Sequence, residues 1–271
     1  MITLTLKEQP SVPLEAEVLS PDVTAQLSTA GIRALPVYLG KRQRRVDDFF
    51  EVDGGSSDQI TIRGDASRVK WLGRAMTRGR IVVDGNAGMH LGAYMSGGTI
   101  EVSGNGSDWV GAEMSGGLIR IGGNAGGQIG AAYRGSSTGM RDGTILIGGS
   151  AGLEVGMRMK RGIIAVSGPV RDFAGLQMKG GTIVLGCGAE LRTGAWMIRG
   201  TIISLGPVPL LPTFSYAATY VPGFLRIYSA YLSSLGITLP FEERRGAYRR
   251  YTGDTSVPGK GEILIWAPRG A

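Results

Sequence analysis

The residue types that most often carry catalysis are scarce in this sequence. Its 271 residues include one histidine, His90, and one cysteine, Cys187. Zinc and most transition-metal sites need several His or Cys ligands, so the chain alone cannot build one, and no carboxylate cluster offers an alternative. Histidine-based acid–base or nucleophilic catalysis would depend on His90 alone. We therefore expect no catalytic residue and no metal ligand here, and interpret His90 as a surface or contact-face side chain.

Glycine-rich segments could instead cradle phosphate groups, as the P-loop of nucleotide-binding enzymes does. Segments such as VGAEMSGGLIRIGGNAG, from Val110 to Gly126, invite that interpretation. No GKS or GKT accompanies any of them, and similar segments recur along the chain. The glycines therefore indicate a repeated structure and not a phosphate site.

The repeat has a period of 19 residues. Its leading glycines lie 19 residues apart, except for one step of 26 that contains an insert near residues 133–139. A methionine and then an isoleucine follow each leading glycine, as Met76 and Ile81 do in the first repeat. Columns of like residues at one period are typical of folds in which each unit stacks on its neighbours. The leading glycines are Gly73, Gly92, Gly111, Gly130, Gly156, Gly175 and Gly194.

The pattern inside each repeat predicts strands. A second apolar residue follows the isoleucine two positions later, as Val83 follows Ile81. Alternation with period two predicts β-strands, and the glycines on either side predict tight turns. About seven coils stacked in parallel would give an all-β fold, a single-stranded β-helix with isoleucine and methionine inside. A string of β-hairpins is the alternative, which the strict columns disfavour.

The repeats divide the chain into three parts. Residues 1–56 form a non-repetitive N-terminal arm with the basic run KRQRR, residues 57–208 form the β-helix, and residues 209–271 form a C-terminal arm. We predict a helix from Phe224 to Leu235 and a strand beginning at Glu262 in the C-terminal arm. Because an open solenoid end exposes unpaired backbone, we expect the arms to cap the two ends or to reach a partner.

The sequence also bears on cellular location. It shows no signal peptide, and Arg226 and two prolines interrupt its most apolar late stretch, Thr219 to Pro240. A single cysteine allows no disulfide framework. We therefore expect a cytoplasmic protein that does not bind membranes.

Apolar and aromatic side chains outside the predicted core suggest a subunit interface. Exposed patches of these types commonly mark contacts with other proteins. Packing under the chain's own arms is the alternative. A polysaccharide-cleaving β-helix enzyme would need a repeated acid in an outward column, and none is present. The predicted interface residues are Trp71, His90, Trp109, Phe173, Val82, Leu146, Val184 and Ile203.

The net charge of +7 and the pI near 9.7 raise the question of nucleic-acid binding. No nucleic-acid-binding module is recognisable, and the aromatic residues are not interleaved with the basic ones. We therefore expect an acidic ligand or an acidic protein surface and no nucleic acid. Basic side chains that follow the methionine column include Lys160, Arg161, Lys179 and Arg199.

Five sequence features together resemble a known family. They are the repeat G-x-x-M-x-x-G-x-I-x-V-x-G, the opening LKEQPSVPLEAEVLSPDV, and the phrases FFEVDG, YRGSSTGM and YTGDTSVPGKGEILIW. The chain resembles the C subunit of formylmethanofuran dehydrogenase and its bacterial counterpart, the C subunit of the formyltransferase/hydrolase complex. The repeat alone is also similar to the glycine-rich C-terminal domain of glutamate synthase. The segment from Leu210 to Pro240 looks more like the bacterial form.

The resemblance implies a right-handed β-helix that serves as a non-catalytic scaffold subunit in one-carbon metabolism. In the bacterial complex, the formyl group passes from formyl-tetrahydromethanopterin to a methanofuran-like carrier and is hydrolysed to formate during formaldehyde oxidation by methylotrophs. The implied partners are the zinc-dependent hydrolase, the formyltransferase and a further structural subunit. Carrier and zinc would then belong to the complex, and we expect no cofactor bound by this chain itself.

The carrier in this family bears a polyglutamate tail, which leads to a hypothesis for the basic residues. We expect Lys160, Arg161, Lys179 and Arg199 to hold or guide that anionic tail. Three alternatives stay open: the C subunit of an archaeal-type formylmethanofuran dehydrogenase, a free-standing glutamate-synthase-like domain, and a β-helix enzyme of its own.

Overall fold

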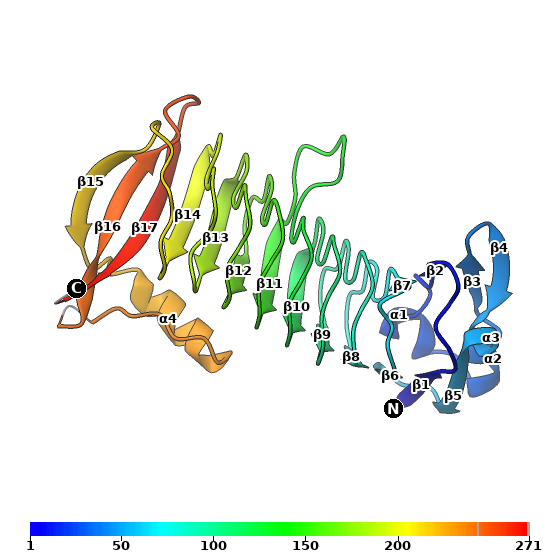
Figure 1. Ribbon diagram of the computed structural model, residues 1–271. Helices are drawn as coiled ribbons and strands as arrows, with labels where there is room; N and C mark the ends of the chain where they lie inside the picture. Colours follow the sequence, from blue (N-terminus) through cyan, green and yellow to red (C-terminus); the bar gives the residue numbers. More distant parts are fainter. Residues whose placement is uncertain (243, 270–271) are drawn as a thin grey trace.

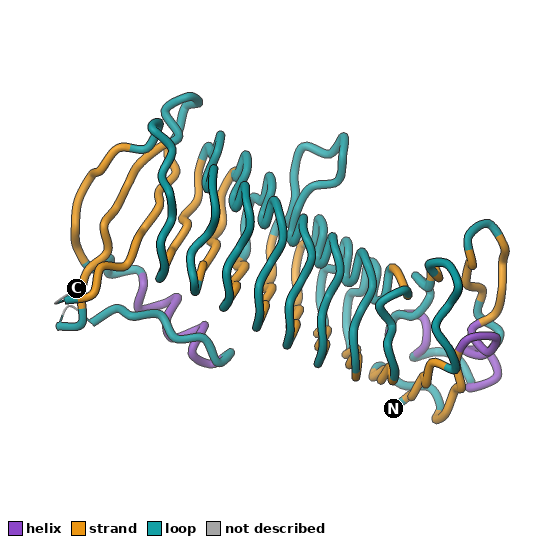
Figure 2. The backbone as a smooth tube through the Cα atoms, in the orientation of Figure 1, coloured by secondary structure: helices purple, strands orange, loops and turns teal. Residues whose placement is uncertain are grey.

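The computed structural model describes residues 1–242 and 244–269; residues 243, 270 and 271 of the predicted C-terminal arm lie outside the described residues. The described chain is all-β, as predicted, with a 13-stranded sheet, a 4-stranded sheet and four short helices. Figure 2 shows a row of similar coils between two less regular ends, with the helices near those ends.

One strand of each repeat lies in the large sheet, and neighbouring strands pair in parallel (Figure 1). The register places like residues opposite each other: Ile81 pairs with Ile100, and Ile100 with Ile119. Ile119 then pairs with Ile145, so the insert between them does not shift the column. The strands of this row are β6 (Gln59–Arg63), β8 (Arg80–Asp84), β9 (Thr99–Val102), β10 (Ser115–Ile121), β11 (Asp142–Ile147), β12 (Ile163–Val166), β13 (Lys179–Leu185) and β14 (Arg199–Ser204).

The predicted isoleucine and methionine columns form the core. Every member of both columns, from Met76 and Ile81 onward, is completely buried. Burial of one such side chain contributes about 1.5–3 kcal/mol. Gly73 shows why glycine leads a coil, since its φ is +66° and a Cβ there would lie 2.7 Å from Cδ1 of Ile100. A side chain at this position would collide with the isoleucine of the next coil.

A second line of backbone pairing joins the coils away from the sheet. Isolated parallel bridges connect Ala66 with Ala87 and Ala87 with Gly106, and the series resumes beyond with Ala125 and Ala151. On each side of this break, neighbouring coils are thereby tied along two lines, which fixes their orientation as well as their spacing.

The N-terminal arm covers one end of the stack. Its first strand, β1, pairs in parallel with β6 and antiparallel with β5. Thr77 lies in the first full coil, and Asp22 of the arm accepts its main-chain N–H at Oδ2 over 2.9 Å. The arm and its neighbouring strand comprise β1 (Ile2–Leu6), β2 (Leu14–Glu15), α1 (Pro21–Thr24), α2 (Thr29–Arg33), β3 (Pro36–Leu39), β4 (Arg42–Arg45), α3 (Val46–Phe49), β5 (Phe50–Gly54) and β7 (Val69–Lys70).

The C-terminal arm extends the large sheet at the other end. Its last strand pairs in parallel with β14, and Ile263 lies opposite Ile202, so the arm adds one more buried isoleucine to the column. The predicted helix and the predicted final strand are both present. No helix among residues 1–242 and 244–269 has the length and apolarity needed to cross a membrane. The elements are β15 (Ser215–Tyr220), α4 (Leu225–Ser234), β16 (Gly246–Gly253) and β17 (Lys260–Pro268).

Helix α4 belongs to a second apolar cluster on the outer face of the large sheet (Figure 1). The cluster includes Leu146, Val184 and Ile203 of the sheet together with Leu225 and Leu232 of the helix, all 2% exposed or less. The prediction that Leu146, Val184 and Ile203 belong to a subunit interface is therefore wrong, because the chain's own arm covers them. The sequence pattern identified the face as apolar but not what packs against it.

Candidate functional site

The seven-residue insert forms a loop that stands out from the stack between β10 and β11 (Figure 1). The following coils hold it in place through its main-chain carbonyls. The guanidinium of Arg158 donates from Nη1 to the carbonyl oxygen of Ser136 at 2.7 Å, and the ammonium of Lys179 donates to that of Ser137. The Ser136–Ser137 part of the insert is therefore held by the coils that come after it.

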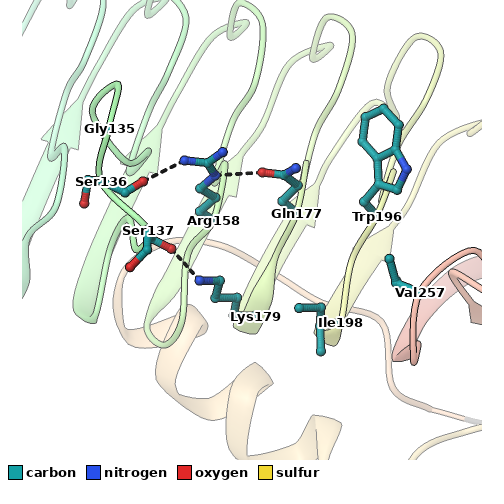
Figure 3. Close-up of a pocket in the computed structure, with 9 residues that line it drawn as sticks. All are labelled: Gly135, Ser136, Ser137, Arg158, Gln177, Lys179, Trp196, Ile198 and Val257. Carbon is teal, nitrogen blue, oxygen red and sulfur yellow. Dashed lines mark hydrogen bonds between the residues drawn. The ribbon is translucent and has the colours of Figure 1, made fainter.

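A groove of about 530 Å³ lies between this loop and the next coils (Figure 3). Its cationic part contains Arg158 and Lys179, and its apolar part contains Trp196 and Ile198, which are 49% and 40% exposed. Positive charge beside an exposed indole suits a ligand that has both a carboxylate and an apolar part. The lining residues are Gly135, Ser136, Ser137, Arg158, Gln177, Lys179, Trp196, Ile198 and Val257.

The two cations of the groove are held by neutral acceptors. Nε of Arg158 donates to Oε1 of Gln177 at 2.7 Å, while its other bond and that of Lys179 go to main-chain carbonyls. Neither cation forms a salt bridge with any of the described residues. Their positive charge is therefore fixed in position without a carboxylate to neutralise it, which attracts an anion.

The four predicted basic residues lie along one corner of successive coils. The main-chain N–H groups of Lys160 and Lys179 donate to the carbonyl oxygens of Met140 and Met159, respectively, each in the coil before. Lys179 lies opposite Arg199 in the register of the sheet. Successive coils of a parallel sheet are about 4.8 Å apart. Lys160, Arg161 and Arg199 are exposed, and Lys179 is half-buried.

Of these four residues, Lys179 alone lines the groove. The sequence reasoning missed Arg158, which comes directly before the buried Met159 and has a positive φ of 58°. Its role depends on the loop above it, and the sequence gives no signal for the direction in which that loop folds. Only the spacing irregularity, which located the insert, could have suggested a site there.

A second candidate site is an aromatic cluster that contains three of the predicted interface residues. The rings of Trp71 and His90 stack with centroids 4.1 Å apart, and those of Trp109 and Tyr133 stack at 4.8 Å. Nδ1 of His90 lies 2.8 Å from the hydroxyl of Tyr133. Tyr133, at the start of the insert, was not predicted to join this column. All four aromatic side chains are half-buried.

The remaining predicted contact residues lie apart from this cluster. Phe173 is three coils beyond Trp109, and the guanidinium of Arg192 lies 4.0 Å from its ring centroid in a cation–π contact. Val82 is half-buried on the outer face of β8 and lies outside the cluster under α4. The structure therefore brings Trp71, His90 and Trp109 together and leaves Phe173 and Val82 separate.

Protonation states follow from the burial of this cluster. Burial lowers the pKa of His90 from 6.5 to about 4, with Lys70 adding to the effect and Asp108 opposing it. Burial also raises the pKa of the Tyr133 hydroxyl well above its usual value. At neutral pH the imidazole is uncharged, and the direction of the hydrogen bond between its Nδ1 and the Tyr133 hydroxyl depends on the tautomer. The ring is thus suited to packing and contact, and a base with so low a pKa is weak.

Metal-ligating side chains form no cluster among the described residues. No group of three or more His, Cys, Asp or Glu side chains in residues 1–242 and 244–269 has the arrangement of a metal site. Cys187 is exposed and unpaired in the turn after β13.

Comparison with known proteins identifies two kinds of relative, although no family model matches the chain. The C subunit of tungsten-containing formylmethanofuran dehydrogenase 2 from Methanothermobacter thermautotrophicus is 43% identical over 95 residues, which cover 33% of this chain and 35% of the relative. The C subunit of molybdenum-containing formylmethanofuran dehydrogenase 1 from Methanosarcina barkeri is 40% identical over 95 residues, 33% of this chain and 32% of the relative. These matches span only about a third of each curated relative.

A solved structure matches over almost the whole length. One chain of the formyltransferase/hydrolase complex from Methylorubrum extorquens, determined in complex with methylofuran, superposes with a TM-score of 0.90 and 32% sequence identity. The match covers 98% of this chain and 99% of that chain. Together with the dehydrogenase relatives, this full-length similarity shows that the chain belongs to the family formed by the C subunits of formylmethanofuran dehydrogenases and formyltransferase/hydrolase complexes.

Proposed function

We propose that the protein is a non-catalytic scaffold subunit of a formyltransferase/hydrolase complex. Such a complex would move formyl from formyl-tetrahydromethanopterin to a methanofuran-like carrier and hydrolyse it to formate in formaldehyde oxidation. The observation that carries the proposal is the match of 98% of the chain to a subunit of the Methylorubrum extorquens complex, with 32% identity. The archaeal-type dehydrogenase is the second candidate, supported by higher identity over a shorter segment.

The scaffold role agrees with the distribution of side chains. The regular spacing of the repeat serves the buried isoleucine and methionine columns, and the single histidine has a pKa of about 4. We infer that residues 57–208 form a single-stranded right-handed β-helix, flanked by arms at 1–56 and 209–271. Parallel register along two lines of pairing supports this geometry, and parallel crossovers are almost always right-handed. The catalytic sites would then belong to the zinc-dependent hydrolase and the formyltransferase. A further structural subunit would complete the complex.

The aromatic cluster is the proposed contact surface for one of those subunits. Interfaces are enriched in aromatic side chains that are partly exposed in the free subunit. Trp71, His90 and Trp109 form a preassembled patch of this kind, and its rings are already ordered by stacking. Phe173 and Val82, which lie apart from this patch, would be separate points of contact with a partner.

The basic corner is the proposed site for the acidic tail of the carrier. Lys160, Arg161, Lys179 and Arg199 present cations on successive coils, so an extended anionic chain could meet one or more of them in each coil. The groove next to Lys179 adds Arg158 as a fixed cation. Zinc and the reacting part of the carrier would be bound by the other subunits.

Purification of the chain from its native host tests the scaffold role. We expect three other polypeptides to co-purify, with both formyl transfer and formylmethanofuran hydrolysis in the assembled complex. The isolated chain should have neither activity. A solitary protein that turns over substrate would instead support a β-helix enzyme, and a solitary inactive one would support a free-standing domain. Co-purification with tungsten- or molybdenum-containing subunits would favour the dehydrogenase.

A further inference from the structure

The hairpin formed by β3 and β4 projects from the N-terminal end of the molecule (Figure 1). All four residues of β4, Arg42 to Arg45, are exposed. A two-residue turn, Gly40 and Lys41, joins the strands, and Gly40 has the positive φ of 60° that such a turn requires. The basic run KRQRR therefore lies on a defined strand and not on an irregular loop.

The outer edge of β4 is open. The strand order of the small sheet is β4-β3-β2-β7, so β4 pairs with β3 on one side, and no described strand lies on the other. The main-chain N–H of Val46 donates to the carbonyl oxygen of Leu35 at 3.0 Å, so the N–H at this position faces β3. Because N–H groups alternate in direction along an antiparallel strand, that of Gln43 faces the open side. An added strand could bond there.

The charges on this hairpin are largely unneutralised. Arg45 pairs with Asp47 at 2.8 Å. Lys41, Arg42 and Arg44 form no salt bridge with the described residues. Arg42 and Arg44 project to the same face of β4, since side chains alternate along a strand. Three cations and one open strand edge therefore lie within a few residues of each other.

We propose that the β3–β4 hairpin binds an extended, acidic segment of another polypeptide, which adds as a strand along the open edge of β4. Main-chain bonds at Gln43 would fix its register, and its carboxylates would meet Lys41, Arg42 and Arg44. A second copy of this chain fits poorly, because its net charge is also +7. Nucleic acid would use the cations alone and leave the open strand edge unpaired. This proposal does not depend on the subunit assignment above.

Binding of a defined peptide to the full chain tests the proposal. The probe is a fluorescein-labelled peptide of alternating glutamate and valine, measured by fluorescence anisotropy at low salt, with a lysine–valine peptide as its control. We expect Arg42→Glu/Arg44→Glu to weaken binding by about tenfold or more, since like charges would then face each other. Arg226→Glu/Arg249→Glu makes the same change in charge at exposed positions of the C-terminal arm and should leave binding unchanged.

A second variant separates strand addition from charge attraction. Gln43→Pro removes an N–H that faces solvent, which edge strands tolerate, so the fold should be retained while peptide binding falls by about tenfold. Normal peptide binding by this variant would overturn the proposal. So would no binding of the acidic peptide to the wild-type chain, in which case the arginines only protect the edge from aggregation. Tighter binding of short single-stranded DNA than of the peptide would also overturn it.

Discussion

The carboxylate of Asp254 accepts the main-chain N–H of Trp196, with 2.8 Å between Oδ2 and the nitrogen. In the preceding coil, the equivalent N–H of Gln177 donates to the carbonyl of Ala195 at 2.8 Å. Asp254 therefore occupies the place that a carbonyl of the following coil takes in the preceding coil. Asp22 acts similarly for Thr77 at the other end. Each arm thus ends the stack with a carboxylate as well as with apolar side chains.

We expect Asp254→Ala to lower the free energy of unfolding by about 1–3 kcal/mol, because it leaves the main-chain donors of Trp196 and Ser256 without their acceptor. Burial opposes ionisation of Asp254, but hydrogen bonds from the Ser256 hydroxyl and from the main-chain N–H groups of Ser256 and Trp196 outweigh it and lower the pKa of the carboxyl. A lowered folded-state pKa stabilises the fold above the unfolded value of 3.8, and this contribution is lost as the pH falls through the folded value.

Urea unfolding of wild type and Asp254→Ala at pH 7 and at about pH 3 measures this effect. The difference between the two proteins should shrink at the lower pH. Asp84→Asn, at an exposed position, is the control and should show little change at either pH. A loss of stability that is the same at both pH values would exclude the carboxylate charge as the cause.

His90 should remain uncharged until the pH falls to about 4. It is the only histidine, so its ring-proton NMR signals can be followed without assignment of others. The unfolded chain binds a proton near pH 6.5 and the folded chain near 4, so folding stability should decrease as the pH falls between these values. His90→Phe keeps an aromatic ring and removes this pH dependence. A titration midpoint near 6.5 in the folded protein would contradict the burial of the ring.

Replacement of Lys160, Arg161, Lys179 and Arg199 by alanine should raise the carrier KM by about tenfold or more in the assembled complex, because an acidic tail would lose its cations. Added salt should weaken carrier use by the wild-type complex and have much less effect on the variant. The matched control replaces four exposed arginines elsewhere, Arg63, Arg171, Arg226 and Arg249. An unchanged KM in the first variant would refute the tail-binding role.

Val184→Asp and Val82→Asp distinguish the covered part of the outer face from the uncovered part. Val184 is 2% exposed under the arm, so a carboxylate there should lower the free energy of unfolding by about 3 kcal/mol or more. Val82 is only half-buried, and Val82→Asp should cost less than about 1 kcal/mol in the isolated chain. If Val82 lies in an interface, the same change should reduce co-purification of the partner subunits. Chemical unfolding and affinity purification measure the two effects.

The regular part of the fold could be predicted because the residues that make its contacts recur at the same position in every repeat. The leading glycines, the methionines and the isoleucines recur at 19 residues, and the structure places like residues directly over one another. The insert could be located by the single irregular step. The column of Leu146, Val184 and Ile203 was recognised as apolar, but its assignment to a subunit interface was wrong, because α4 and the rest of the C-terminal arm cover it.

By itself, the sequence determined the period, the buried columns and the all-β class, because each position can be compared with its copies one coil away. Only the tertiary structure decided where the segments outside the repeat, the insert and the two arms, pack against the coils. It placed Tyr133 against His90, brought Arg158 under the insert loop and set Asp254 at the end of the stack. The physical reason is that these contacts join segments that occur once, so no periodicity reports them, and their geometry depends on how loops and arms fold back over the coils.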